Sequence, residues 1–245
     1  MIYGTRAVIE AILAGKDIER IMVLSGMNNE LIRELLNTAK DRNVPVSFVP
    51  EEKLKRISAK NHQGVICLLS SVSYASLENI IDKAFSDGRE PFLVILDRVT
   101  DVRNFGAVAR TAECAGVDAI IIAEKGNAPM SNDSMKTSAG ALNHLPVCRE
   151  PDLKKTLKLL HESGIKVIAC TEKAGKSLYD VDVTGPVAIV LGSEEDGVSD
   201  ALLRDADDLA KIPIKGKIES LNVSVAAGVA IYEIVRRREA SKPLK

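Results

Sequence analysis

The stretch FLVILDRVTDVRNFGAVAR, residues 92–110, decides the fold. Its first five residues are apolar, as in a strand that is buried on both faces of a parallel sheet. After a polar connection, small and apolar side chains repeat with helical spacing. A buried strand that leads into a helix is the unit from which α/β folds are built. Ligands of such sheets bind beyond the carboxyl ends of the strands, so Asn104, Gly106 and Arg110 stand where a site is expected.

The same alternation of strand and helix continues after this stretch. Apolar runs such as VDAIII and VAIVLG again favour buried parallel strands, and helices with one apolar face lie between them. The sequence therefore predicts an α/β domain with a mostly parallel sheet. The predicted strands are 92–97, 118–123, 145–148, 165–170, 187–191 and 209–212, and the predicted helices are 105–116, 131–140, 151–163, 199–204 and 222–238.

The beginning of the chain predicts a second, smaller α/β unit. Strands are expected at 19–24, 44–49 and 64–72, with helices at 4–14, 28–43 and 50–58. The Ser- and Gly-containing stretch that follows is interpreted as a linker with a short helix. The predicted domains are thus 1–72, a linker over 73–88, and 89–245.

Composition sets limits on the class of protein. The 245 residues are 46% hydrophobic and 27% charged, and the formal net charge of −1 neither indicates nor excludes a nucleic-acid partner. The dispersed cysteines, Cys67, Cys114, Cys148 and Cys170, are expected to be core thiols of a cytoplasmic protein. The three histidines are scattered, so no metal site is expected, and no apolar run is long enough to cross a membrane.

Two further stretches combine glycines with polar residues at predicted strand ends. IVLGSEEDGVSDALL (189–203) leads from a strand through two glycines into a helix. KIPIKGKIESLNVSVAAGVAIYEIVRRR (211–238) leads through a polar loop into a helix rich in small residues. Spacing alone leaves ordinary interpretations open for each stretch: a capped helix with a solvated arginine, a strand-to-helix turn, and a close packing surface. The chain has neither a GxGxxG nor a Walker sequence, which argues against common nucleotide sites.

Taken together and in this order, the three stretches resemble the signature motifs of the SpoU (TrmH-type) RNA ribose 2′-O-methyltransferases of the SPOUT superfamily. The first motif matches as NFGAVAR (104–110), the second as LGSEEDGVS (191–199), and the third as IPIKGKIESLNVSVA (212–226). The family often has glycine where this chain has Glu195, so the second loop can differ in conformation. The resemblance implies a deep trefoil knot in the C-terminal domain and S-adenosyl-L-methionine as the cofactor.

The resemblance also implies roles for individual residues. Arg110 would be the central catalytic residue, acting either as a base or as a clamp on an RNA phosphate. The guanidinium pKa is so high that the clamp is the easier role. The other residues implied in catalysis are Asn104, Glu194, Ser220 and Asn222, and those implied in cofactor binding are Gly192, Ile212, Leu221 and Thr171.

Residues 1–72 resemble the L30e-like substrate-binding domain of the rRNA-specific members, through YGTRAVIEAIL near the start and NHQGV at 61–65. The resemblance favours a guanosine of 23S rRNA as the target and a homodimer formed through the C-terminal domain. A tRNA 2′-O-methyltransferase and a non-catalytic RNA-binding or ribosome-assembly protein are the alternatives. The predicted RNA-binding residues, which could equally form a solvated helix face, are Lys53, Lys55, Arg56 and Lys60.

Overall fold

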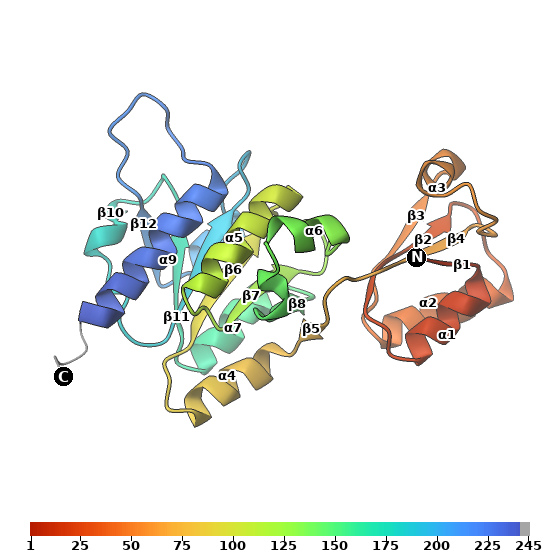
Figure 1. Cartoon of the computed structure of the whole chain (residues 1–245), viewed down its shortest axis with the longest axis horizontal. Coiled ribbons are helices and arrows are strands. Elements are labelled where there is room, and N and C mark those ends of the chain that lie inside the picture. The colour runs from red at the N-terminus through yellow and green to blue at the C-terminus, as the bar shows by residue number, and fades with distance from the viewer. Residues whose placement is uncertain (241–245) are drawn as a thin grey trace. The chain divides into compact units, whose positions relative to one another are not determined.

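The chain divides into two compact units. A computed structural model describes residues 1–240 and separates Met1–Ser73 from the part that begins at Tyr74. Both units are α/β, as Figure 1 shows. The last five residues of the predicted C-terminal domain lie outside the described residues. The predicted fold class is confirmed, although the trefoil knot stays a prediction.

The first unit is a four-stranded sheet with helices on both faces. The strand order is β1-β4-β2-β3, in which only the β2–β3 pair is parallel. Side chains of α1 and α2 pack on one face, and α3 packs on the other. In chain order the elements are β1 (Ile2–Tyr3), α1 (Thr5–Leu13), β2 (Ile18–Leu24), α2 (Glu30–Asp41), β3 (Val46–Val49), α3 (Glu51–Ile57) and β4 (Val65–Leu69).

The second unit is built on an eight-stranded sheet in which every pair is parallel. The strand order is β10-β12-β9-β11-β6-β7-β8-β5. The elements are β5 (Tyr74–Ala75), α4 (Leu77–Ser86), β6 (Phe92–Asp97), α5 (Val102–Cys114), β7 (Ala119–Ala123), α6 (Asn132–Thr137), η1 (Ala141–Asn143), β8 (Val147–Glu150), α7 (Leu153–Glu162), β9 (Lys166–Cys170), β10 (Lys176–Ser177), η2 (Leu178–Asp180), β11 (Val187–Gly192), α8 (Asp200–Asp205), β12 (Asp208–Lys211) and α9 (Val223–Ala240).

The central strands of this sheet are covered on both faces. All six residues of β6 are buried, which is why the sequence there is apolar rather than alternating. Helices α4, α7 and α8 contribute leucines and isoleucines to the core on one face. Helices α5 and α9 lie side by side, and α9 also contacts β11 (Figure 1). Strands β6 and β11 are parallel neighbours, with Gly192 opposite Asp97, so their carboxyl ends lie at the same edge of the sheet.

Of the predicted linker, 73–88, all but Ser73 belongs to the second unit. Strand β5 pairs with β8, and α4 buries Leu77 and Ile81 in the core. These two side chains are one helical turn apart and form a narrow apolar stripe, which is enough to dock the helix. The Ser and Gly residues of this stretch are equally typical of a linker, which is why the sequence alone does not reveal the docked helix. The two-residue strands β1, β5 and β10 were also not predicted.

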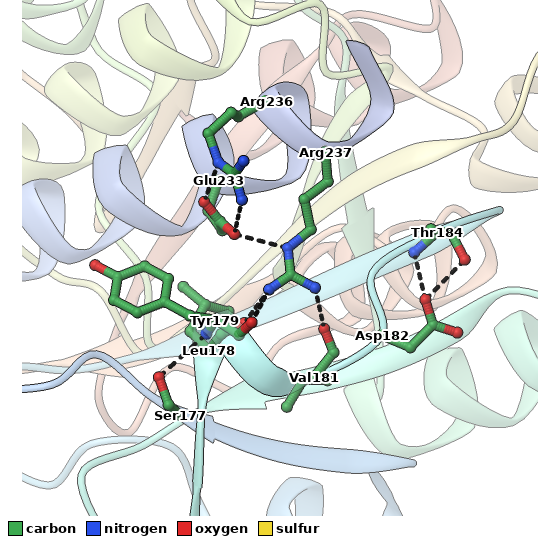
Figure 2. Close-up of polar contacts among 9 residues, drawn as sticks. All are labelled: Ser177, Leu178, Tyr179, Val181, Asp182, Thr184, Glu233, Arg236 and Arg237. Atoms are coloured by element: carbon green, nitrogen blue, oxygen red, sulfur yellow. Dashed lines mark hydrogen bonds and ion pairs between the residues drawn. The ribbon is translucent and has the colours of Figure 1, made fainter. Parts of the chain in front are cut away.

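The end of α9 is bound firmly to its own domain. Glu233, only 8% exposed, accepts hydrogen bonds from Arg236 and Arg237 (Figure 2). Arg237 also donates to the carbonyl oxygens of Val181, at 2.8 Å, and Tyr179. Arg238, the next residue, donates to the backbone carbonyls of Glu90, Pro91 and Gly185. Two of the three consecutive arginines are therefore structural ties rather than a solvated end or a phosphate site.

Replacing Glu233 by glutamine should destabilise the second unit. The two arginines lower the pKa of Glu233 from 4.5 to about 2, so the carboxylate stabilises the fold. That stabilisation is complete above pH 4.5 and is lost as the pH falls toward 2. We expect Glu233→Gln to reduce the free energy of unfolding by about 2 kcal/mol at pH 7 and by much less at pH 3. Urea unfolding at the two pH values measures this. Glu239→Gln, at an exposed position of the same helix, is the control.

A loss for Glu233→Gln that is the same at both pH values would contradict the ionic explanation. Such a result would mean that shape, rather than charge, holds this end of α9.

Within residues 1–240 no helix is both long and apolar enough to cross a membrane.

Candidate functional site

The connection after β6 is held by two charged residues that the sequence analysis did not select. Asp97 is 5% exposed and accepts a hydrogen bond of 2.7 Å from the backbone N–H of Ser199. Arg98 has a left-handed φ of 59° and reaches across to the loop that follows β11. There its guanidinium donates to Asp196, at 2.9 Å, and to the carbonyl oxygen of Gly197, at 3.1 Å. These contacts tie the first motif to the second.

The start of α5 frees the side chain of Asn104. The N-cap is Asp101, whose carboxylate accepts from the backbone N–H groups of Arg103 and Asn104. Asp101, and not Asn104, is therefore the residue that caps this helix, which leaves the Asn104 side chain available for other contacts. Gly106 is needed for packing within the chain. A Cβ atom there would lie 2.1 Å from the hydroxyl oxygen of Thr137 on α6.

The loop of the second motif folds back on itself. A Cβ atom on Gly192 would lie 2.0 Å from the carbonyl carbon of Gly197, so only glycine permits this approach. Gly197 has a left-handed φ of 65°, and Ser193 pairs with it in an antiparallel bridge. The Ser193 hydroxyl accepts a hydrogen bond from the N–H of Asp196 at 3.1 Å. The turn places Glu194 at its tip.

Three polar side chains, one from each motif, meet in front of this turn. Asn104 donates to Glu194 Oε1 at 2.9 Å, and Asn222 donates to the same oxygen at 2.5 Å. Asn222 also donates to Asn104 Oδ1 at 3.1 Å. Its own Oδ1 accepts from the N–H and hydroxyl of Ser224, which fixes the orientation of the amide. We call Asn104, Glu194 and Asn222 the polar triangle.

A cavity of about 850 Å³ opens beside the polar triangle. Its walls are the loops that follow β9, β11 and β12, at the carboxyl ends of these strands, together with the start of α9. All four residues predicted to bind the cofactor line it, namely Thr171, Gly192, Ile212 and Leu221. So do three of the residues predicted to act in catalysis, namely Glu194, Ser220 and Asn222.

Arg110 does not line this cavity. It lies six residues beyond Asn104 on α5, about 9 Å along the helix axis and on a different side of it. It borders a second hollow, of about 280 Å³, together with Glu113, Asn143 and His144. Its side chain is exposed and makes no hydrogen bond or ion pair within residues 1–240. Within one chain, the cavity and the polar triangle thus bring together every predicted site residue of the second unit except Arg110.

The cations predicted to bind RNA lie on and just after α3. All four are exposed, but they are not equivalent. Lys55 is paired with Glu51 at 2.8 Å, which neutralises its charge locally. Lys60 lies with its ammonium 5.6 Å from the ring centre of Tyr3. Lys53 and Arg56 have no ion pair within the described part of the chain.

The remaining chemistry of the chain is limited. No group of three or more His, Cys, Asp or Glu within residues 1–240 could hold a metal ion. Burial raises the pKa of the Cys67 thiol to about 11 and that of Cys148 to about 12, as expected for core cysteines. Cys114 is exposed, in contrast to its prediction as a core thiol, because it is the last residue of α5 and faces away from the sheet.

Both units match known protein families. Residues 91–232 match the SpoU rRNA methylase family. Residues 1–75 match the family described as RNA 2′-O ribose methyltransferase substrate binding. The second match covers most of the first unit's range and the first match lies within the second unit, and both agree with the resemblance seen in the three motifs.

Curated relatives are similar along nearly the whole chain. YacO of Bacillus subtilis strain 168, assigned to the TrmH family of tRNA/rRNA methyltransferases, is 32% identical over 97% of this chain and 95% of its own length. The tRNA/rRNA methyltransferase slr0955 of Synechocystis, described as uncharacterised, is 35% identical over 99% of this chain. The present chain spans 64% of the length of that second relative.

Solved structures share the fold. The SpoU methyltransferase AviRb of Streptomyces viridochromogenes, in complex with AdoMet, is 25% identical with a TM-score of 0.62, covering 98% of this chain and 90% of its own. An AdoMet-bound rRNA methyltransferase of Sinorhizobium meliloti has a TM-score of 0.60 at 25% identity, over 96% of this chain and 86% of its own. A TrmH/SpoU tRNA modifying enzyme of A. aeolicus, 27% identical with a TM-score of 0.57, covers 66% of this chain and 85% of its own. This chain belongs to the SpoU (TrmH-type) family of RNA methyltransferases and takes its methyl group from S-adenosylmethionine.

Proposed function

We propose that the protein methylates the ribose 2′-hydroxyl of a guanosine in 23S rRNA. The observation that carries this proposal is the polar triangle, in which the three motifs converge at the mouth of the 850 Å³ cavity. A polar cluster beside a roomy cavity at the carboxyl ends of parallel strands is the arrangement expected of a ligand site in this class of fold.

The cavity suits S-adenosylmethionine. Its volume lies within the usual range for sites that bind molecules of this size. The close approach of Gly192 to Gly197 shapes the loop that forms one wall, and Ile212 and Leu221 offer apolar surface. Bound S-adenosylmethionine supplies a methyl group on a sulfonium, which is already a good leaving group. The protein therefore has to orient the ribose and activate its 2′-hydroxyl, which loses its proton as the methyl group is transferred, rather than activate the donor.

The residues outside the cofactor cavity would position the RNA. The polar triangle and Ser220 offer amide, carboxylate and hydroxyl groups that can hold the ribose hydroxyls. Arg110 is exposed, and a guanidinium is a donor without an acceptor, so it serves better as a clamp on a phosphate than as a base. Because Arg110 lies on a different side of α5 from Asn104, the two side chains would hold different parts of the RNA.

The choice of rRNA rests on the first unit. The rRNA methyltransferase structure covers 96% of this chain, whereas the tRNA modifying enzyme covers 66%. The latter figure is close to the size of the second unit alone. The stretch SAGALNHLPV (138–147), the first part of which lines the hollow next to Arg110, also resembles the guanosine-specific rRNA members.

Transfer of a labelled methyl group tests this proposal. The substrates are protein-free 23S rRNA and bulk tRNA, each taken from cells that lack the modification. We expect label in 23S rRNA alone. Label in tRNA would favour the tRNA alternative, and removing residues 1–73 should then leave activity unchanged. Cofactor binding that fails outright would favour the non-catalytic alternative.

The protein should be a homodimer through α9 and the loop before it. The family resemblance implies this, and the surface supports it: Leu221, Val225 and Tyr232 are 40–52% exposed, and the last two lie on one helical stripe. We expect light scattering at micromolar concentration to give twice the mass of one chain. Tyr232→Glu should yield monomers, whereas Phe85→Glu, at an exposed aromatic on α4, should not. A wild-type protein with the mass of one chain would contradict the dimer.

A further inference from the structure

The first unit has a sheet face that its helices leave half covered. On this face α3 covers Met22, Val49 and Ile66, which are at most 4% exposed. Figure 1 shows α1 and α2 together on the opposite face. The other half of the α3 face carries side chains that are exposed or only partly buried, and we call them the open sheet face: Met1, Tyr3, Arg20 and Leu68. Tyr3 and Leu68 also pack against the cluster under α3, so each offers only part of its surface to a ligand.

Strand pairing fixes where these side chains lie. Tyr3 of β1 opposes Ile66 of β4, and Leu68 of β4 opposes Arg20 of β2. The Tyr3 hydroxyl lies 3.7 Å from the sulfur of Met1, which places that residue on the same face. Tyr3 and Arg20 lie on strands that are separated by one strand, and they are offset by two residues along the strand direction. Their Cα atoms are therefore about 12 Å apart. A short stretch of extended nucleic acid can bridge that distance.

The chemistry of the open sheet face is apolar and cationic. The Lys60 ammonium lies 5.6 Å from the centre of the Tyr3 ring. Arg20 makes no hydrogen bond or ion pair within the described residues, and no member of the open sheet face is acidic. An aromatic ring beside aliphatic surface and unpaired cations is what proteins use to bind single-stranded nucleic acid. Two cations with no acidic residue among them favour a ligand that carries regularly spaced negative charges, as an RNA backbone does.

We propose that the open sheet face binds an unpaired segment of the substrate RNA. A base stacks on Tyr3 and packs against Leu68, while Arg20 and Lys60 hold the adjoining phosphates. Without RNA, Lys60 covers the ring, so an incoming base displaces its ammonium toward the RNA backbone. Stacking on a side chain requires an unpaired base, so the target is a loop or bulge rather than a duplex. The identity of the ligand as RNA rests on the proposed function.

The affinity of the full-length protein for unmodified, protein-free 23S rRNA tests this inference without any turnover. We expect Tyr3→Ala and Arg20→Ala each to weaken binding about tenfold. Tyr3→Phe should bind as the wild type does, because it keeps the ring. Arg20→Ala should also lower the slope of log affinity against log salt by about 1, and Tyr3→Ala should not.

The matched control is Phe48→Ala. Phe48 is 53% exposed on β3, but it pairs in register with Val23, whose side chain is in the core under α1 and α2. It therefore points to the other face, and its loss should leave RNA affinity unchanged. Tyr3→Ala could disturb the β1–β4 pairing, so thermal unfolding is measured for every variant. If Tyr3→Ala does not fold, Arg20→Ala decides.

RNA affinity within twofold of wild type for the folded variants would overturn the inference. So would unchanged affinity together with a change of mass in light scattering, which would assign the open sheet face to a second copy of the chain. These outcomes are separate from failure of the proposed function. If the proposed function is wrong, the wild-type protein transfers no methyl group, whatever its affinity for the RNA.

Discussion

Replacing Arg110 by alanine should lower the rate of methyl transfer by about 10³-fold while the affinity for S-adenosylmethionine stays unchanged. The side chain lies outside the 850 Å³ cavity, so its loss removes no cofactor contact. It is exposed and unpaired within residues 1–240, so its loss should not destabilise α5 either. Single-turnover kinetics with saturating RNA, together with calorimetric titration of the cofactor, separate the two effects.

Two variants sharpen this prediction. Arg110→Lys keeps the charge but loses the planar fork of the guanidinium, and it should recover only part of the rate. Arg103→Ala removes an exposed arginine from the same helix and should have little effect. If Arg110→Ala turns over nearly as fast as the wild type, Arg110 has no part in methyl transfer. A cofactor affinity that falls together with the rate would place it in the cofactor cavity instead.

Replacing Gly192 by alanine should strongly weaken cofactor binding. The added Cβ would lie about 2 Å from the backbone of both Gly197 and Val198, and backbone cannot turn aside as a flexible side chain can. The loop would have to move, and with it Glu194 and the cavity wall. We expect an affinity for S-adenosylmethionine at least about 10²-fold weaker and a lower unfolding temperature.

Gly175→Ala is the matched control for that variant. Gly175 lies in the neighbouring loop after β9, and a Cβ there would meet no atom within 4 Å. It should bind the cofactor as the wild type does. If Gly192→Ala keeps wild-type affinity, then the fold of this loop does not shape the cofactor cavity.

The sheet and the convergence of the motifs could be predicted because both follow from local patterns. Fully apolar strands such as β6 indicate a covered parallel sheet. The rule that ligands lie at carboxyl strand ends then brings Asn104, Glu194 and Asn222 to one edge before any coordinates are known. The structure adds the hydrogen bonds by which these three side chains contact one another.

The parts that could not be predicted depend on contacts between distant segments. Arg98 reaches Asp196, 98 residues away, and no local pattern announces such a pair. The position of Arg110 beside His144 depends on how the 140–144 turn packs against α5, which helical spacing does not reveal. The docking of α4 rests on a stripe too short to distinguish a core helix from a linker.

The nucleoside that carries the methyl group is the most direct test of the account. 23S rRNA labelled by the wild-type protein would be digested to nucleosides and analysed by mass spectrometry. We predict 2′-O-methylguanosine at a single position, because the polar triangle is placed to hold a ribose and the first unit to select one segment of RNA. A methylated base, or methylated riboses spread over many positions, would contradict this account.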